Sequence, residues 1–241
     1  RVAFTRTGDM MRIPSLTKHP GNKLFSLTMG SEIVNPLESE MSNAFSINKT
    51  LWGDTELAIS WTQLNKYAEG GEKDTEIGLH MHKKIYQYGQ FDMIAGIQDF
   101  LIRSSNTGEG VVYYDNLSPF LLFSSNQQYD EYTLIMQFGV GGGKIGYDSQ
   151  KNGNGSRLGP MAGMLLYLPY FKENGGARFI MEYIGTAVNL GLSIPFSPQY
   201  QFHFGLTNFQ ALSASNLLIA DPSEALEIVE TSSAFSLGLT I

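Results

Sequence analysis

Residues 187–207 read AVNLGLSIPFSPQYQFHFGLT, with an apolar or aromatic side chain at every second position on either side of a break that contains two prolines. A period of two belongs to a β-strand with one apolar face and one small or polar face. The stretch therefore predicts two strands joined by a short turn. Their large apolar residues are Val188, Leu190, Leu192, Ile194, Tyr200, Phe202, Phe204 and Leu206.

The surrounding region, from residue 183 to residue 220, has no Asp, Glu, Lys or Arg, which raises the question of a membrane-spanning helix. Such a helix needs about 20 mostly apolar residues, whereas prolines, amides and His203 recur here at short intervals. We therefore predict strands. The same alternation predicts about twelve strands along the chain, the others being at residues 25–30, 44–48, 56–62, 76–82, 91–98, 119–125, 132–140, 159–168, 178–183 and 234–241.

The composition of the two strand faces distinguishes a soluble sandwich from a membrane barrel. The outer faces of a soluble β-sandwich meet water and are rich in Lys, Glu and Thr. Here the second face carries mostly Gly, Ala, Ser, Thr, Asn, Gln and His, and charged residues make up 16% of the chain. Small polar residues suit the interior of a narrow barrel, and large apolar ones suit lipid. We predict an all-β protein, a single antiparallel transmembrane β-barrel of about twelve strands.

Connection lengths favour the outer membrane of a Gram-negative-type bacterium, because barrels there alternate short periplasmic turns with longer external loops. Connections after even-numbered strands are short, and most of those after odd-numbered strands are long. This parity predicts both termini on the periplasmic side. We expect residues 22–241 to form the barrel and residues 1–21 to form a periplasmic lead-in or an inserted plug. In the last long loop, Asp221 with Glu224 matches a capping box and predicts a short helix.

Charge and cysteine content exclude several classes of protein. Lys and Arg number 16 against 23 Asp and Glu, a net charge of -7 that leaves little basic surface for nucleic acid. With no cysteine, disulfides, thiolate metal ligands and a cysteine nucleophile are excluded. No Gly-x-Ser-x-Gly motif occurs, and the glycine run at residues 139–143 lacks the Lys-Ser or Lys-Thr of a phosphate loop. We interpret that run as a strand end where neighbouring backbones approach closely.

The candidate functional residues are polar and charged side chains expected on the lumen face of the barrel. His80 and His82 share a strand face about 7 Å apart, a spacing that two metal ligands could use, but the sequence places no third ligand. Glu56 and Glu76 join the charged candidates, and all of these are expected to pair inside the barrel because an isolated buried charge is costly. We expect no catalytic residue, no metal, no cofactor and no enzymatic activity. The candidates are His80, His82, Asp92, Arg178, Glu182, Asn189 and His203.

Four short motifs occur in order along most of the chain. They are TGDMMRIPS at residues 7–15, AGIQDF at 95–100, FGVGGGKIG at 138–146, and EYIG with NLGL within 182–192. Together they resemble motifs of YjbH-like proteins, outer-membrane barrels associated with exopolysaccharide production. The resemblance implies an outer-membrane barrel with a role in polysaccharide export or envelope assembly. It carries over no catalytic residues.

These observations predict an outer-membrane barrel that acts as a structural or accessory component of an envelope secretion or surface assembly. Its partners would be outer-membrane lipid and other envelope proteins, and not nucleic acid. Three alternatives stay open, namely a porin or conduit for small solutes or polysaccharide, a membrane-embedded hydrolase, and a soluble β-sandwich. Ion conductance, substrate turnover and a requirement for detergent would distinguish them.

Overall fold

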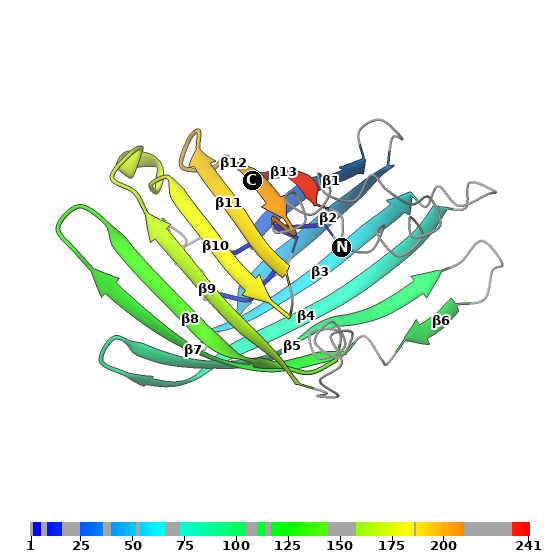
Figure 1. Ribbon diagram of the computed structural model, residues 1–241, viewed down its shortest axis with the longest axis horizontal. Coiled ribbons are helices and arrows are strands. Elements are labelled where there is room, and N and C mark those ends of the chain that lie inside the picture. Colours follow the sequence, from blue (N-terminus) through cyan, green and yellow to red (C-terminus); the bar gives the residue numbers. More distant parts are fainter. Residues whose placement is uncertain are drawn as a thin grey trace, which may run out of the picture.

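The computed structural model is a closed antiparallel β-barrel (Figure 1). Over the described residues, thirteen strands form one sheet in the order β4-β3-β2-β1-β13-β12-β11-β10-β9-β8-β7-β5-β6, and β4 also pairs with β5. That last pairing closes a ring of twelve strands, while β6 only extends the sheet beside β5. The structure describes residues 2–5, 9–15, 25–35, 40–51, 54–65, 73–104, 110–113, 117–143, 158–185, 187–209 and 233–241.

The strands follow one another around the ring in nearly sequential order, so each pairs with its neighbours in the chain. There are two exceptions: β7 pairs with β5 and not with β6, and β1 pairs with β13, which joins the first and last strands of the described chain. The strands are β1 (Phe25–Asn35), β2 (Glu40–Leu51), β3 (Thr55–Asn65), β4 (Lys73–Tyr88), β5 (Phe91–Ser104), β6 (Gly110–Tyr113), β7 (Ser118–Gln128), β8 (Thr133–Gly141), β9 (Gly159–Tyr167), β10 (Arg178–Ile184), β11 (Ala187–Pro195), β12 (Gln201–Thr207) and β13 (Ala234–Thr240).

The structure confirms the predicted fold class. All twelve strands predicted from the period-two alternation are present, and the closed ring excludes the soluble β-sandwich. The helix predicted around Asp221 and Glu224 lies outside the described residues. Within the described ranges the helical structure is a single 3-10 turn, η3 (Lys172–Asn174), between β9 and β10. No helix in those ranges is long and apolar enough to cross a membrane.

The connections β2–β3, β4–β5, β7–β8, β9–β10 and β11–β12 all lie at one end of the barrel, which we call the turn end (Figure 1). The start of β1 and the end of β13 lie at the same end, since Leu27 and Ile241 exchange backbone hydrogen bonds of 2.8 and 3.0 Å. The tightest of these connections is Gly89–Gln90, where Gly89 has a φ of 58° that suits glycine. That the turn end faces the periplasm stays a prediction.

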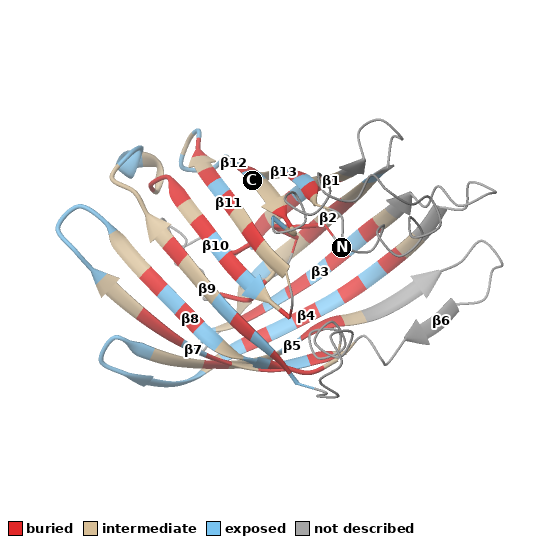
Figure 2. Ribbon diagram, viewed as in Figure 1, coloured by how far each residue is buried: buried red, intermediate tan, exposed pale blue. Residues whose placement is uncertain are grey.

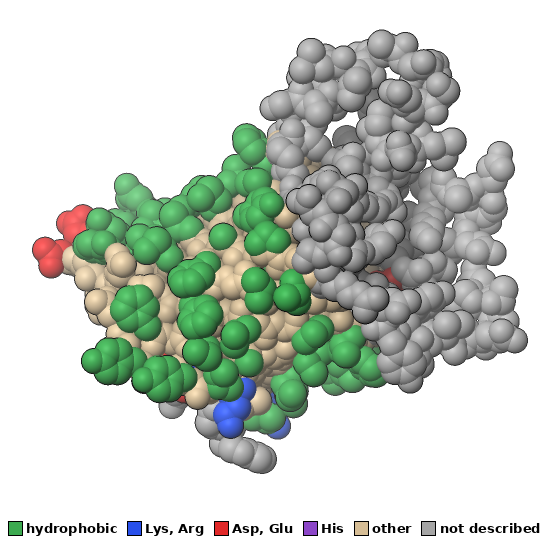
Figure 3. Space-filling view, turned by 60° about the horizontal axis from the view of Figure 1, so that its bottom comes forward, with side chains coloured by type: hydrophobic (Ala, Val, Ile, Leu, Met, Phe, Trp, Pro, Cys, Tyr) green, Lys and Arg blue, Asp and Glu red, His purple; other side chains and the backbone are tan. Residues whose placement is uncertain are grey.

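Side chains along each strand alternate between the outside and the interior of the barrel, as Figure 2 shows by its bands of exposed and buried residues. On β12, Phe202 and Phe204 are 43% and 45% exposed, while His203 between them is 6% exposed. The outer side of the wall is accordingly covered by apolar side chains, with charges confined to its edges in the coloured part of Figure 3. Such an exterior is complementary to acyl chains.

Aromatic side chains gather on the outside at the turn end. Among the described residues, the β4–β5, β7–β8, β9–β10 and β11–β12 hairpins each contribute at least two of them, and all are more than a third exposed. Amphipathic rings at this level form the girdle that marks a membrane–water interface. These residues are Tyr86, Tyr88, Phe91, Tyr129, Tyr132, Tyr170, Phe171, Phe196 and Tyr200.

A charge placed on the apolar exterior should destabilise the barrel in a depth-dependent way. Phe204 lies at the centre of β12, whereas Tyr200 lies just before the strand, within the girdle. We expect Phe204→Arg to cost about 2–4 kcal/mol and Tyr200→Arg about 0–1 kcal/mol, because lipid solvates a charge least at mid-depth. Urea unfolding in lipid vesicles measures both values. Equal costs for the two variants would show that the exterior does not face a bilayer.

The N-terminal segment, defined here as residues 2–5 and 9–15, lies inside the ring of strands (Figure 1). Apart from Arg12, each of its residues is buried. Its two parts are joined by a backbone hydrogen bond of 2.9 Å from Phe4 N to Met11 O. Its backbone and side chains contact inward-facing residues of β1, β5, β9, β10 and β12. The segment therefore occupies part of the lumen, the interior of the barrel.

Candidate functional site

Glu182, on the lumen face of β10, binds the backbone of the N-terminal segment. Its Oε1 accepts hydrogen bonds from Arg12 N at 2.9 Å and from Ile13 N at 3.1 Å. Its Oε2 accepts one from Asn189 Nδ2 at 3.3 Å, and Asn189 Oδ1 in turn accepts the backbone N–H of Asn208 at 3.1 Å. Hydrogen bonds from several donors compensate a carboxylate for its lost hydration. Glu182 and Asn189, both predicted from sequence, therefore act together.

A second carboxylate, Glu32 on β1, binds the other part of the same segment. Glu32 Oε2 accepts a hydrogen bond from Ala3 N at 3.1 Å, and Oε1 accepts one from Thr207 Oγ1 at 3.0 Å. Arg12 Nη2 forms an ion pair with Glu32 Oε1 at 2.8 Å. Because the Arg12 backbone binds Glu182, this one residue links two carboxylates from different strands of the wall.

Two further predicted residues contact the N-terminal segment through Asp9 and Phe4. Arg178 pairs with Asp9 and lies over the Tyr167 ring, 5.0 Å from its centroid. Tyr167 also donates a hydrogen bond of 3.0 Å to Asp9 Oδ2. His203 stacks on Phe4 with 4.8 Å between ring centroids. Since Arg178 and His203 are almost fully buried, each depends on the segment to cover it.

The sequence predicted that small, polar side chains line the interior of the barrel. On the side of β7, β9 and β10 the interior is more apolar than this prediction. Large residues of these strands point inward and pack against Met10, Met11 and Ile13 of the N-terminal segment. Glycines nearby make room for the methionines, because a Cβ built on Gly205 would lie 2.4 Å from Met11 Cε. The segment therefore packs into the wall as core residues do. The inward apolar residues include Phe120, Leu122, Met161, Leu165 and Ile180.

A polar cavity of about 550 Å³ lies in the lumen at the turn end. Its wall comes from β2, β3, β4, β5, β7 and β8, and Ser15 of the N-terminal segment borders it. The volume lies within the range of about 300–1,000 Å³ that is typical of ligand sites. The cavity therefore has room for a small organic molecule or a group of waters. Side-chain amides dominate its lining, namely Gln87, Gln90, Asn126, Gln128 and Gln137.

The charges in this cavity are mostly negative. Lys84 forms an ion pair with Asp54 at 2.8 Å and donates a hydrogen bond of 3.0 Å to Gln87. Its distance to Asp92 Oδ1 is 4.0 Å, too long for a hydrogen bond. Glu56 also lines the cavity and lies 3.7 Å from His82. Among the described residues of its lining, Asp54, Glu56 and Asp92 thus face one lysine, which leaves two formal negative charges in excess.

His80 lies in an arrangement that resembles a Ser-His-Asp triad but has the wrong hydrogen-bond direction. Ser60 Oγ is 2.9 Å from His80 Nε2, and Asp99 Oδ1 is 3.8 Å from Nδ1. However, the backbone N–H of Asp99 donates to Nδ1 at 3.2 Å, so in the neutral ring Nε2 carries the proton and donates it to Ser60. A triad requires the opposite tautomer, in which Nε2 accepts the proton of the serine. This geometry gives no support to a hydrolase.

The remaining predicted residues are separated from one another. His80 contacts Ser60 and Asp99, His82 lies near Glu56, and Asp92 lines the polar cavity. Over the described ranges, no three His, Asp or Glu side chains are grouped as a metal site would require. The structure therefore divides the seven candidates into four that contact the N-terminal segment or support that contact, and three that lie across the lumen. The four are Arg178, Glu182, Asn189 and His203.

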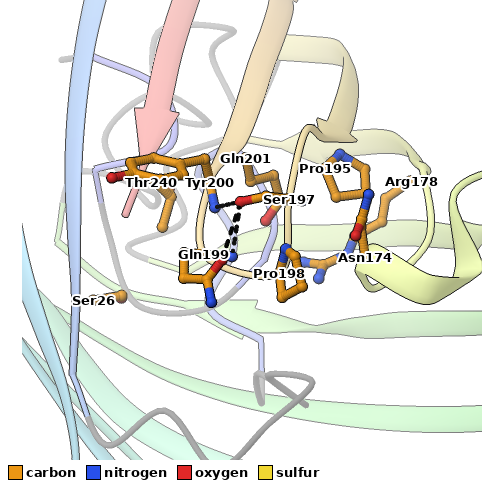
Figure 4. A pocket seen from close by; sticks show the side chains of 10 residues that line it. All are labelled: Ser26, Asn174, Arg178, Pro195, Ser197, Pro198, Gln199, Tyr200, Gln201 and Thr240. Carbon is orange, nitrogen blue, oxygen red and sulfur yellow. Dashed lines mark hydrogen bonds between the residues drawn. The ribbon is translucent and has the colours of Figure 1, made fainter.

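A smaller pocket at the β11–β12 turn is shown in Figure 4. In it Ser197 Oγ accepts hydrogen bonds of 3.2 Å from the backbone N–H groups of Gln199 and Tyr200, which hold the turn. Arg178 and Asn174 lie at its other side. The pocket offers about 20 Å³, close to the space of a single water molecule. It is too small for an organic ligand.

Several residues of the site were not predicted from the sequence. Glu32 and Arg12 carry no motif that marks them as partners. Asp99 is turned inward by a β-bulge, since the β4–β5 register shifts between Leu79 and Met81 and Asp99 has a φ of 56°. A strict period of two would place Asp99 outside. The resemblance motifs at residues 7–15 and 95–100 contain Arg12 and Asp99 but assigned them no role, and Glu32 lies in neither motif.

Comparisons with known proteins identify solved structures of the same architecture. No protein-family model matches the chain, and no curated protein sequence matches it. A structure of KdgM porin superposes with a TM-score of 0.50 at 11% identity, covering 89% of this chain and 97% of the porin. KdgM porin in complex with disordered oligogalacturonate gives 0.48 at 11% identity with the same coverage. Outer membrane phospholipase A from Escherichia coli gives 0.41 at 10% identity, covering 90% and 92%.

The class of protein follows from the barrel and its surface. A closed, even-stranded antiparallel barrel with an apolar exterior and an aromatic girdle is the architecture of outer-membrane β-barrels. The chain is a twelve-stranded barrel of this class, with the fold of KdgM porin. It is located in the outer membrane of a Gram-negative-type bacterium, in contact with membrane lipid, as predicted from the sequence. The likeness in fold assigns no family.

Proposed function

We propose that the barrel is a porin-type conduit for small polar solutes. The observation that carries this proposal is the polar cavity of about 550 Å³ in the lumen. A scaffold needs no hydrated chamber, whereas a conducting barrel requires one. The shared fold of KdgM porin is consistent with this function, although many functions occur on one fold.

The N-terminal segment would restrict passage, because it lies in the lumen against the inward faces of β1, β5, β9, β10 and β12. Hydrogen bonds and one ion pair attach it to Glu182 and Glu32. Such contacts can exchange for water without breaking a covalent bond. The conduit would therefore be narrow at rest and wider when the segment moves.

A bulky residue in the cavity should slow solute passage. Ser124 lines the cavity on β7, and Phe123 beside it is 37% exposed on the outer face. Vesicles containing the full chain should swell in an isotonic solution of a small sugar. The Ser124→Trp variant should lose most of this swelling rate. Phe123→Trp is the matched control and should swell like the wild type.

Two outcomes would contradict the proposed conduit. One is wild-type swelling no faster than that of protein-free vesicles. The other is an equal swelling rate for Ser124→Trp and Phe123→Trp when both variants are folded. Either would favour the second candidate below.

The second candidate is an accessory role in an envelope assembly that secretes or displays polysaccharide. It is supported by the motifs that resemble YjbH-like proteins and by the packing of Met10, Met11 and Ile13 into the wall, which suits a closed barrel. This role predicts negligible conductance and copurifying envelope proteins. For either role we propose that the barrel is not an enzyme, in keeping with the hydrogen-bond direction at His80.

A further inference from the structure

We propose that the turn-end cavity is a binding site for a small polyhydroxylated molecule that carries a protonated amine, an amino sugar being the simplest example. The inference deepens the proposed conduit function, because it names the class of solute that the lumen would select. It stands on the cavity, its charges and its unpaired acceptors.

The balance of charge in the cavity favours a cation. Lys84 is bound to Asp54 and Gln87, at 2.8 and 3.0 Å. Asp92 shares this lysine at 4.0 Å, beyond hydrogen-bond distance, so its charge is only partly compensated. A carboxylate with a low-dielectric wall behind it concentrates cations and excludes anions. An ammonium group placed near Asp92 would supply the missing charge.

Unpaired acceptors in the cavity require donors from a ligand. Gln137 is 3% exposed and lines the cavity, and in the described part of the chain its Oε1 has no hydrogen-bond partner. Asp92 Oδ1 is likewise buried without a hydrogen bond. A buried acceptor without a donor is costly, because it has lost its hydrogen bonds to water. Both atoms would be satisfied by ammonium or hydroxyl donors, whereas a further carboxylate would satisfy neither.

The rest of the lining suits hydroxyl groups. Gln87, Gln90, Asn126 and Gln128 each offer a carbonyl and an amide group, which can accept from and donate to sugar hydroxyls. The volume of about 550 Å³ is sufficient for a monosaccharide with some of its water. Taken with the charges, this lining selects an amino sugar over a neutral sugar and a neutral sugar over a sugar acid.

Three sugars with the same ring test this expected order of affinities directly. Calorimetric titration of the detergent-solubilised full chain would use D-glucosamine, D-glucose and D-glucuronate at about pH 6, where an amine is protonated and carboxylates are ionised. We expect glucosamine to bind at least about tenfold more tightly than glucose, the factor that 1.4 kcal/mol represents. Glucuronate should show no heat of binding. Equal affinities for the three sugars, or no binding of glucosamine, would overturn the proposal.

Variants locate the site. Asp92→Asn should weaken glucosamine binding about tenfold and leave glucose binding nearly unchanged. Gln137→Leu removes an acceptor and should weaken both. Asp130→Asn alters an exposed carboxylate in the β7–β8 turn, outside this cavity, and is the control. If Asp130→Asn changes the affinity as much as Asp92→Asn, binding reflects overall charge and the site is refuted.

Failure of this inference and failure of the conduit are distinguishable. Binding is measured without transport, and swelling is measured without knowledge of the preferred sugar. If swelling depends on Ser124 but the three sugars bind without selectivity, only the proposed binding site is refuted. Selective glucosamine binding without any swelling would uphold the site and remove the conduit.

Discussion

Glu182→Ala is expected to release the N-terminal segment from the wall of the barrel. The substitution leaves Arg12 N, Ile13 N and Asn189 Nδ2 without their acceptor in a buried region. Leaving a buried donor without its acceptor costs about 1–3 kcal/mol. The backbone hydrogen bonds between the barrel strands are unchanged. We therefore expect the lost stabilisation to appear as local opening of the N-terminal segment and not as unfolding of the barrel.

Trypsin provides the measurement for Glu182→Ala. In the folded wild type, cleavage after Arg12 should be slow, because the backbone of Arg12 and Ile13 is bound to Glu182 inside the lumen. In the variant, mass spectrometry should detect rapid cleavage at this bond. Glu173→Ala, which changes an exposed carboxylate between β9 and β10, should digest like the wild type. Equal protection of Arg12 in wild type and Glu182→Ala would show that Glu182 does not hold the segment.

Gly139→Ala is expected to prevent correct closure of the sheet between β7 and β8. A Cβ on Gly139 would lie 2.1 Å from the carbonyl oxygen of Leu121 and 2.9 Å from the Cα of Leu122. These are backbone atoms of the paired strand, so rotation of a side chain cannot relieve the contact. Overpacking usually costs about 1–3 kcal/mol, and a backbone clash should reach or exceed the upper value.

Gly238→Ala is the matched control for Gly139→Ala. Its nearest atoms are 3.3 to 3.4 Å from the built Cβ, and the closest are side-chain atoms of His203. Electrophoresis without heating separates folded from unfolded barrels, so it reports the folded fraction of each variant. We expect little folded Gly139→Ala and a nearly normal yield of Gly238→Ala. A normal yield of both would mean that β7 and β8 approach less closely at Gly139 than the structure shows.

The strands could be predicted because their cause is local. Each strand shows a period of two in its own sequence, as in Phe202 and Phe204 on either side of His203. The large apolar face is the one that suits lipid, so the face with small residues is assigned to the interior. The glycine run from Gly139 was predicted to mark a close backbone approach, and the contacts with Leu121 and Leu122 agree with that interpretation. Closure by pairing of β1 with β13 then follows from an even number of strands.

The site could be predicted only in part, because its partners are far apart in sequence. Glu182 and Arg178 were recognisable as charges on an inward face. Their partners Arg12 and Asp9 lie about 170 positions away in a segment without periodicity, so no spacing connects them. Asp99 depends on a bulge that shifts the register, which alternation cannot show.

The most direct test of the account is the single-channel conductance of the full chain in planar lipid bilayers, compared with that of a Glu32→Ala, Glu182→Ala double variant. The substitutions remove both carboxylates that attach the N-terminal segment to the wall. We expect a small, steady current for the wild type and a clearly larger one for the double variant, in which the segment no longer narrows the lumen. Equal currents from the two proteins, or no current from either, would contradict a conduit restricted by this segment.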